Sequence, residues 1–402
     1  MKYKDTEVGI IPESWEVKPI KEVTEIVTDY VANGSFASLA ENVKYKDEPD
    51  EAVLIRLVDY NNEFNGNFVF IDSHAYEFLS KSKLFGGEII ISNVGANVGT
   101  VFRCPKLKYK MSLAPNSVMV TFKENDDFYF HWLRGHNGQS MLKSIVTGSA
   151  QPKFNKTNLR EMLVPVPPIE VQDKIANILN TIDDKIEINK SINKNLEQQA
   201  QALFKSWFVD FEPFSNRKPN DWSISTLGSV SIMGAGGDKP QNVSPIKTDL
   251  YEYPIYSNGL SDEGLYGFTD KPKISEESVT VSARGTIGFV CLRHIPYMPI
   301  VRLVTLIPKT EIISAKYLYL WLKQFHIAGT GTTQQQLTVP DFQKTEILVP
   351  SQENVTLFTA TVEPIFEKIW ANQIENEKLS SLRDTLLPRL VSGELDVSNI
   401  DL

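Results

Sequence analysis

The sequence predicts an α+β protein in which two similar globular domains are joined to a long two-helix coiled coil, giving the chain a pseudo-twofold internal repeat. Ten apolar or polar seam positions recur 183 residues further on, from Ile175 to Phe358 at their start. The same short landmarks also occur in the same order in both halves. At 402 residues the chain is long enough for two or three domains with cores of their own.

The seam positions are spaced alternately four and three residues apart, which marks one stripe along a helix. The first set is Ile175, Leu179, Ile182, Ile186, Asn189, Asn193, Leu196, Ala200, Leu203 and Trp207. The second set is Phe358, Val362, Ile365, Ile369, Asn372, Asn376, Leu379, Arg383, Leu386 and Leu390. The first stripe predicts a helix roughly 48 Å long at about 1.5 Å per residue. Two separate amphipathic helices, each packed on its own domain, are the alternative.

Asparagine pairs at the middle of each stripe favour the coiled coil, because polar seam residues cost stability but fix register. Antiparallel pairing sets Asn189 against Asn376 and Asn193 against Asn372, and places the two globular parts at opposite ends. Parallel pairing also matches asparagine to asparagine, so the stripes leave the orientation open. Pro364 predicts a kink in the second helix or a later start for it.

The remaining landmarks predict the globular elements in chain order. Each half opens with Pro-x-x-Trp, ending at Trp15 or Trp222, and a short alternating run follows. A buried strand then enters a glycine turn, at residues 89–99 and again at 279–288, where glycine allows positive φ or close backbone approach. An aromatic helix comes next, at residues 128–142 and 315–325. Gly-Ser/Thr-x-Gln segments and a Leu-Val-Pro strand close each half, and a long helix starts after each Leu-Val-Pro.

Composition is that of a soluble globular protein, and without a signal-peptide or membrane-span pattern we expect it in the cytoplasm. The apolar fraction is 42% and the charged fraction 23%. Residues 1–8 have no apolar signal-peptide core, and no run approaches the roughly 18 apolar residues that a membrane span needs. Cys104 and Cys291 have no CxxC spacing and are too few for a disulfide scaffold, so we expect buried free thiols.

A formal charge of −9 argues against a free-standing nucleic-acid binder, because phosphate neutralisation supplies most of the affinity of such proteins. If the chain contacts DNA, a partner protein is expected to help hold it.

No catalytic or metal-binding residues are predicted. The segment starting at Gly234 lacks the third glycine of a dinucleotide loop. Asp183 and Asp184 resemble part of a nuclease triplet, but they fall outside the seam of a helix and are expected on its solvated face. His131 and His136 are five residues apart, which does not place two ligands on one helical face. The sequence also contains no P-loop and no Asn-Pro-Pro-Tyr adenine-methylation motif.

With no catalytic or metal site predicted, the remaining function is recognition by polar side chains on two similar domains. Asn and Gln can each make two hydrogen bonds to adenine and Arg to guanine, while lysines suit phosphates. The DNA-binding candidates are Ser92, Asn93, Asn97, Arg103, Lys106, Lys108, Lys110, Ser149, Gln151, Lys153, Ser282, Arg284, Thr286, Thr333, Gln334 and Gln335. Ordinary loop polarity is the plainer reading of any single one of them; the duplicated set favours recognition.

The chain resembles, over its whole length, the specificity subunit of type I restriction-modification systems. The Pro-x-x-Trp openings, glycine turns and Leu-Val-Pro closes all match that family. More specific are the helix start at residues 171–176, Val-Gln-Asp-Lys-Ile-Ala, and the Phe-Lys-Ser-Trp-Phe segment at residues 204–208.

The resemblance implies four parts and an antiparallel orientation of the helices. Residues 1–165 and 213–350 would be target recognition domains, each reading one half of a bipartite, asymmetric DNA site. Residues 166–212 and 351–402 would be the conserved spacer helices, which set the gap and bind two methyltransferase subunits. Restriction-translocase subunits would complete the complex. The resemblance also implies that this chain is non-catalytic and that S-adenosylmethionine, ATP and magnesium belong to its partners.

Two alternatives remain open. A non-catalytic adaptor that binds proteins through two heads would show the same repeat. The recognition part of a single-chain restriction-methylation enzyme would also look similar, although such a chain should carry methylation motifs.

Overall fold

The computed structural model describes residues 2–325, 327, 336–398 and 400, and it forms two compact units. Unit 1 consists of Met1–Ile188 and Glu375–Leu402, and unit 2 is Asn189–Ile374. Helices α8 (Ile169–Phe208) and α12 (Gln352–Val391) each contribute one half to either unit. Each globular part therefore includes a pair of half-helices.

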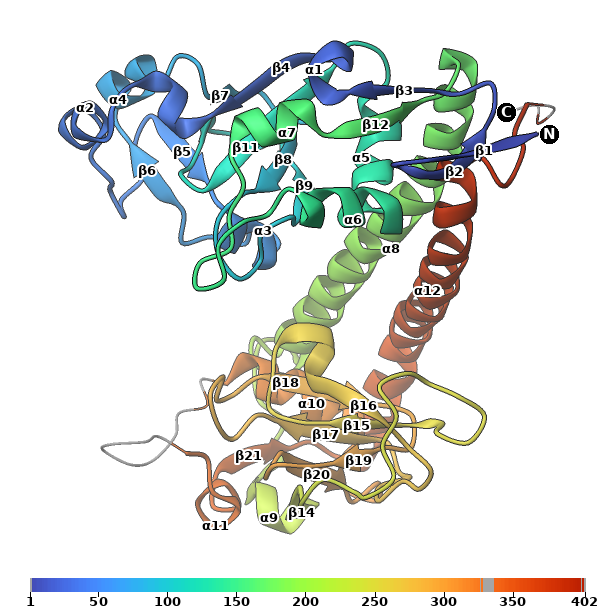
Figure 1. The fold of residues 1–402 in the computed structure, drawn as a ribbon. Coiled ribbons are helices and arrows are strands. Elements are labelled where there is room, and N and C mark those ends of the chain that lie inside the picture. The colour runs from blue at the N-terminus through green and yellow to red at the C-terminus, as the bar shows by residue number, and fades with distance from the viewer. Residues whose placement is uncertain (1, 326, 328–335, 399, 401–402) are drawn as a thin grey trace. The chain divides into compact units, whose positions relative to one another are not determined.

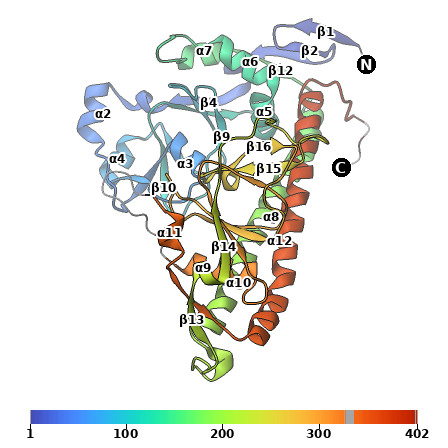
Figure 2. The same cartoon turned by 90° about the horizontal axis from the view of Figure 1, so that it is seen from below.

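The globular part of unit 1 is a set of small sheets with helices between them (Figure 1). Its strands are β1 (Tyr3–Thr6), β2 (Gly9–Pro12), β3 (Glu16–Pro19), β4 (Thr24–Asp29), β5 (Ala52–Ile55), β6 (Val69–Ile71), β7 (Lys83–Leu84), β8 (Ile89–Ser92), β9 (Val101–Arg103), β10 (Lys110–Leu113), β11 (Ser117–Phe122) and β12 (Leu163–Val166). Its helices are α1 (Ile20–Val23), the 3-10 helix η1 (Tyr30–Asn33), α2 (Phe36–Asn42), α3 (Leu57–Asn61), α4 (Ser73–Phe78), α5 (Asp126–Arg134), α6 (His136–Ser144) and α7 (Lys156–Glu161). Helices α2 and α4 lie side by side (Figures 1 and 2).

Among the residues that the structure describes, the globular part of unit 2 has fewer elements than that of unit 1. Its strands are β13 (Ser223–Thr226), β14 (Ser231–Ala235), β15 (Tyr253–Tyr256), β16 (Leu265–Thr269), β17 (Ser278–Val281), β18 (Val290–Arg293), β19 (Met298–Pro299), β20 (Val304–Pro308) and β21 (Glu346–Val349). Its helices are the 3-10 helices η2 (Glu212–Phe214) and η3 (Ser261–Gly264), and α9 (Leu227–Val230), α10 (Ala315–Gln324) and α11 (Val339–Phe342).

The internal repeat is visible in the strand order of both units. The sheet β4-β11-β8-β9 of unit 1 matches β14-β20-β17-β18 of unit 2, and all of its pairs are antiparallel in both. In a second sheet, β5 pairs antiparallel with β6 and parallel with β10, as β15 pairs with β16 and β19. The predicted opening and closing runs pair with each other, β3 with β12 and β13 with β21. The predicted fold class is therefore confirmed.

Each unit has an aromatic core that includes its share of the long helices. In unit 1, Trp15 and Trp132 are buried with Leu179 of α8 and Leu390 of α12. In unit 2, the Phe208 ring packs against Trp222, Tyr317 and Phe358, with centroids 4.8–5.5 Å apart. The half-helices are thus part of each domain's core, because their apolar stripes would otherwise face water.

The two helices run antiparallel, a point that the stripes left open. In unit 2, Asn193 lies beside Ile369 and Asn372, whereas Phe208 lies beside Phe358. In unit 1, the Asn376 amide lies 3.5 Å from the Ile186 carbonyl. Every predicted seam residue is buried or half-buried.

Pro364 does not mark the start of the second helix, because α12 begins at Gln352, directly after Ser351. Pro364 is exposed, and so is Ala360, whose carbonyl would have bonded to a residue with an N–H at position 364. The missing hydrogen bond therefore lies on the solvent side, where water can replace it, while Val362 and Phe366 on the other side are buried.

One predicted helix, at residues 128–142, is two helices. The chain breaks at Gly135, whose extended backbone caps α6 and whose N–H donates to the carbonyls of His131 and Trp132. Gly138 then lies so close to α5 that a Cβ there would be 2.2 Å from the Trp132 oxygen. Helix α6 therefore folds back tightly on α5, which an aromatic pattern alone does not indicate.

Candidate nucleic-acid interface

Strand β8 of unit 1 ends in the predicted glycine turn. Gly95 and Gly99 have φ of +103° and +92°, a region that residues with a Cβ rarely adopt. The turn closes through a hydrogen bond from the Gly99 N–H to the Ser92 carbonyl (2.8 Å). The turn exposes Asn97, whereas the Ser92 side chain is buried.

A second loop, residues 147–153, lies directly against this turn. The Gly95 N–H donates to the Pro152 carbonyl (2.9 Å), and the Asn93 amide donates to the Phe154 carbonyl (3.2 Å). The candidates Ser149, Gln151 and Lys153 are all exposed. The structure therefore brings two sets of candidates, far apart in sequence, onto adjacent loops.

Unit 2 repeats the glycine turn, after β17, with different side chains. Gly285 and Gly288 have φ of +69° and +86°. The Leu337 N–H donates to the Ala283 carbonyl (3.0 Å), and the exposed Arg284 guanidinium donates to the Gln336 amide oxygen (3.1 Å). Ser282 is buried. Thr333, Gln334 and Gln335 lie outside the described residues.

Both turns hold a buried polar atom without a hydrogen-bond partner among the residues that the structure describes. These atoms are Asn93 Oδ1 in unit 1 and Thr286 Oγ1 in unit 2. Buried polar atoms of this kind usually bond to protein or to an ordered water, so the two turns are polar inside as well as at their surface.

The basic candidates between the end of β9 and the start of β10 divide into two groups. Lys106, Lys108 and Lys110 are exposed, although Lys110 forms an ion pair with Glu51. Arg103 is only half-exposed. It donates to the Gly87 carbonyl (2.7 Å), and burial lowers the pKa of its guanidinium.

Arg103 also begins a polar network that reaches helix α8. Its guanidinium forms an ion pair with Asp127 and lies over the Phe130 ring, 4.6 Å from the centroid. Asp127 accepts from the Asn180 amide (2.9 Å), and the Asn180 oxygen lies 2.8 Å from Nε2 of buried His131. These contacts favour a structural role for Arg103.

The two cysteine thiols and Asp183 are held by burial or by ion pairs. Cys104 and Cys291 are free and buried, as predicted. Burial raises the pKa of both thiols, to about 12 for Cys291, which suppresses the reactive thiolate. Asp183 forms ion pairs with Arg134 and Arg383. Across the described ranges no group of three or more His, Cys, Asp or Glu side chains is placed to hold a metal ion.

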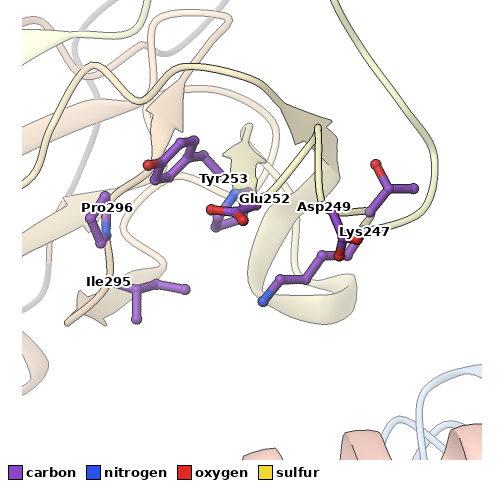
Figure 3. Close-up of a pocket in the computed structure, with 8 residues that line it drawn as sticks. Lys247, Asp249, Glu252, Tyr253, Ile295 and Pro296 are labelled. Carbon is purple, nitrogen blue, oxygen red and sulfur yellow. The ribbon is translucent and has the colours of Figure 1, made fainter.

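A cavity of about 580 Å³ lies in unit 2. Figure 3 shows Lys247, Asp249 and Glu252 on one part of its wall, with Ile295 and Pro296 on another. The acidic excess of this wall disfavours a phosphate ligand. None of the predicted candidates lines it.

Sequence reasoning missed the side chains that hold the loops of unit 2 in place. Asn258, just after β15, accepts from the Ala283 N–H (2.7 Å) and donates to the Val301 carbonyl (2.7 Å). Arg302, next to Val301, is exposed with φ of +60°. No glycine or asparagine marks the turn at residues 300–303, so the sequence carried no signal for it.

Comparison with known proteins agrees with this picture. Residues 12–198 and 219–379 match the family described as "Type I restriction modification DNA specificity domain". The specificity subunit of the type I restriction enzyme MjaIX from Methanocaldococcus jannaschii is 26% identical to this chain over 437 aligned residues. The alignment covers 99% of this chain and 97% of the relative. The HindI specificity subunit of Haemophilus influenzae is 28% identical, over 71% of this chain and 80% of its own.

A solved structure is similar in fold over nearly the whole chain. The S subunit of a type I restriction-modification system from M. genitalium superposes with a TM-score of 0.56 at 16% identity, covering 94% of this chain and 96% of that one. No helix in the described part of the chain has the length and apolar character to cross a membrane. With both of its repeated halves matched, this chain belongs to the family of type I restriction-modification DNA specificity subunits.

Proposed function

We propose that this chain gives a type I restriction-modification complex its DNA sequence specificity, with each unit reading one half of a bipartite site. One observation carries the proposal: both units keep the same strand order and a glycine turn at the same strand end, but the exposed side chains beside these turns differ in chemistry. Unit 1 presents Asn97 and Gln151, and unit 2 presents Arg284. Asn97 and Gln151 suit adenine edges and Arg284 suits guanine, so the two half-sites should differ.

The chain itself is non-catalytic in this proposal, and its partners supply the chemistry. Two methyltransferase subunits bind the long helices and bring S-adenosylmethionine, while restriction-translocase subunits bring ATP and magnesium. Exposed apolar side chains on the helices support such docking: Ile188 and Leu382 in unit 1, and Ile192 and Ile374 in unit 2. The complex would act on DNA in the cytoplasm.

The net charge of the chain agrees with DNA binding that is shared with the methyltransferase subunits. A protein of formal charge −9 binds phosphates weakly by itself, because counterion release supplies much of DNA affinity. The methyltransferase subunits would close around the duplex and provide most of the basic surface.

The test is single-molecule sequencing of methylated adenines in cells that express this chain with its methyltransferase. We expect one asymmetric motif made of two defined half-sites and an unspecified gap. Replacing residues 213–350 with the second domain of another family member should change one half-site and leave the other as it was. Independent reading is wrong if both halves change.

The purified complex should also bind a duplex containing the motif in the presence of competitor DNA. A protein-binding adaptor would show no such preference.

A further inference from the structure

The turn that joins β19 to β20 in unit 2 has an unusual backbone. Val301 and Arg302 have φ of +53° and +60°, and both are exposed. Two consecutive residues with positive φ make a tight turn that normally uses Asn and Gly, and a β-branched residue is a true outlier there. The surrounding structure must therefore impose this conformation.

The segment that contains Gly236 and Gly237 holds the turn from one side. The Val301 and Arg302 N–H groups donate to the carbonyls of Gly237 (2.8 Å) and Gly236 (2.9 Å). A Cβ on Gly236 would lie 2.7 Å from the Ile300 nitrogen, so only glycine permits this approach. The glycines that resemble a dinucleotide loop in the sequence thus brace the turn. Ile300 and Leu303, on either side of it, are buried.

Asn258 couples this turn to the glycine turn after β17. Its side-chain oxygen receives the Ala283 N–H, next to Arg284, and its amide donates to the Val301 carbonyl, next to Arg302. One side chain therefore fixes the backbone beside two exposed arginines. Within the described part of the chain, the Arg302 guanidinium has no hydrogen bond or ion pair of its own.

The same two turns meet in unit 1. The Asn93 N–H, in the glycine turn, donates to the carbonyl of Asn116 (3.0 Å) in the turn that joins β10 to β11. Asn116 is exposed and has φ of +67°. The repeat therefore keeps this turn beside the glycine turn in both units, with Asn exposed in one and Arg in the other.

We propose that the β19–β20 turn is a further DNA-reading loop, and that Arg302 sets specificity by donating two hydrogen bonds to a guanine edge. This inference rests on the proposed function of unit 2. A phosphate contact needs only a positive charge and tolerates a mobile side chain. A guanidinium that donates two hydrogen bonds to guanine must be held in one position. The backbone of the β19–β20 turn, fixed by its hydrogen bonds, provides that position. Asn258 is the positioning residue.

Arg302→Lys separates the two kinds of contact, because it keeps the charge and loses the planar pair of donors. The variant is expressed with the methyltransferase, and methylated adenines are sequenced. We expect discrimination at one G·C pair in the half-site of unit 2 to fall by roughly 5- to 150-fold, with the half-site of unit 1 unchanged. Asn258→Asp, which loses the donor to Val301, should weaken discrimination at the same pair.

Arg217→Lys is the matched control, since Arg217 is an exposed arginine outside the turn and its replacement should leave the motif intact. Thermal melting confirms that each variant folds. The inference is overturned if Arg302→Lys keeps full discrimination, or if Arg302→Ala lowers methylation evenly at all sequences, as loss of a phosphate contact would. A wild-type complex that methylates no bipartite motif would instead reject the proposed function itself.

Discussion

Arg103 and Lys108 show how burial separates two basic residues that look alike in sequence. Arg103 is held by Asp127 and by the Gly87 carbonyl, whereas Lys108 is exposed with its ammonium 5.0 Å from the Tyr109 ring centroid. A guanidinium that is already paired is expected to bind a DNA phosphate weakly, because binding would first have to break the existing contacts.

Alanine at these two positions should therefore have different effects. Arg103→Ala is expected to lower the free energy of unfolding by roughly 1–3 kcal/mol, because it leaves polar partners unsatisfied. It should leave the salt dependence of DNA binding by the complex unchanged. Lys108→Ala should spare stability and reduce the slope of log affinity against log salt by about 1, as expected for the loss of one phosphate contact. Chemical denaturation and salt titrations measure the two effects, and a reversed pattern would contradict the assignment.

Buried His131 makes the stability of unit 1 depend on pH. Burial lowers its pKa from the ordinary value of 6.5, and Arg134 contributes to that shift, while Asn180, Asp183 and Asp127 oppose it. The unfolded chain therefore binds the proton more readily than the folded one. The free energy of unfolding should be highest above pH 6.5 and should fall as the pH drops below it.

Denaturant unfolding between pH 8 and pH 5 measures this dependence. His131→Gln, which keeps a donor for Asn180 and cannot titrate, should flatten the part of the curve that arises from this residue. An identical pH dependence in the variant would assign the effect to other groups.

At the scale of elements, Asn193 and Asn372 form a hydrogen-bonded polar layer within the apolar seam of the two helices in unit 2. The Asn372 amide donates to Asn193 Oδ1 (2.7 Å), and the Asn193 amide donates to the Ile369 carbonyl (3.1 Å). Asn372 is 1% exposed. Such a pair costs stability relative to leucine, and it fixes how the helices align.

Replacing one partner should be worse than replacing both. Asn372→Leu is expected to lower the free energy of unfolding by about 1–3 kcal/mol, since half-buried Asn193 loses its hydrogen-bond donor inside the seam. The double variant Asn193→Leu, Asn372→Leu should recover most of that loss. A double-mutant cycle by chemical denaturation gives the coupling, and additive single effects would mean that the two asparagines act independently.

The sequence predicted the elements that carry their own periodic or glycine signal. Spacing alone predicted the helical stripes and the β8 and β17 strands with their positive-φ glycines. It also predicted that the second half of the chain repeats the first. Orientation of the helices could not, because the asparagines match either way. The break at Gly135 and the strained turn at Val301 also escaped, because both are imposed by neighbours distant in sequence.

The candidate site divides in the same way. Loop chemistry predicted Arg284 and Gln151, which are exposed, but Ser92 and Ser282 are buried at strand ends. Whether a side chain is exposed depends on how the domain packs, and the residue type alone does not predict that. Arg302 was missed because its importance comes from the backbone that displays it.

At the scale of the whole molecule, the proposed function makes the long helices set the gap between half-sites. Inserting one heptad into each of α8 and α12 should lengthen the pair by about 10 Å, or roughly three base pairs of DNA rise. Methylated-adenine sequencing should then show the same half-sites with a longer gap. An unchanged gap would reject a spacing role, and a heptad in one helix only, which breaks the Asn193–Asn372 register, is the control.

Unit 1 is assembled from two stretches of chain that the ribosome makes far apart in time. Its β1–β2 hairpin meets Gly393, where a Cβ would lie 2.6 Å from Pro12 and 2.9 Å from Trp15, and the Lys174 ammonium donates to the Ser398 carbonyl (2.8 Å). Unit 2 is one continuous stretch, so it can complete its core during synthesis. Of the two units, unit 1 is thus begun earlier and finished later, and part of its apolar interior stays uncovered until the stretch that starts at Glu375 has been made.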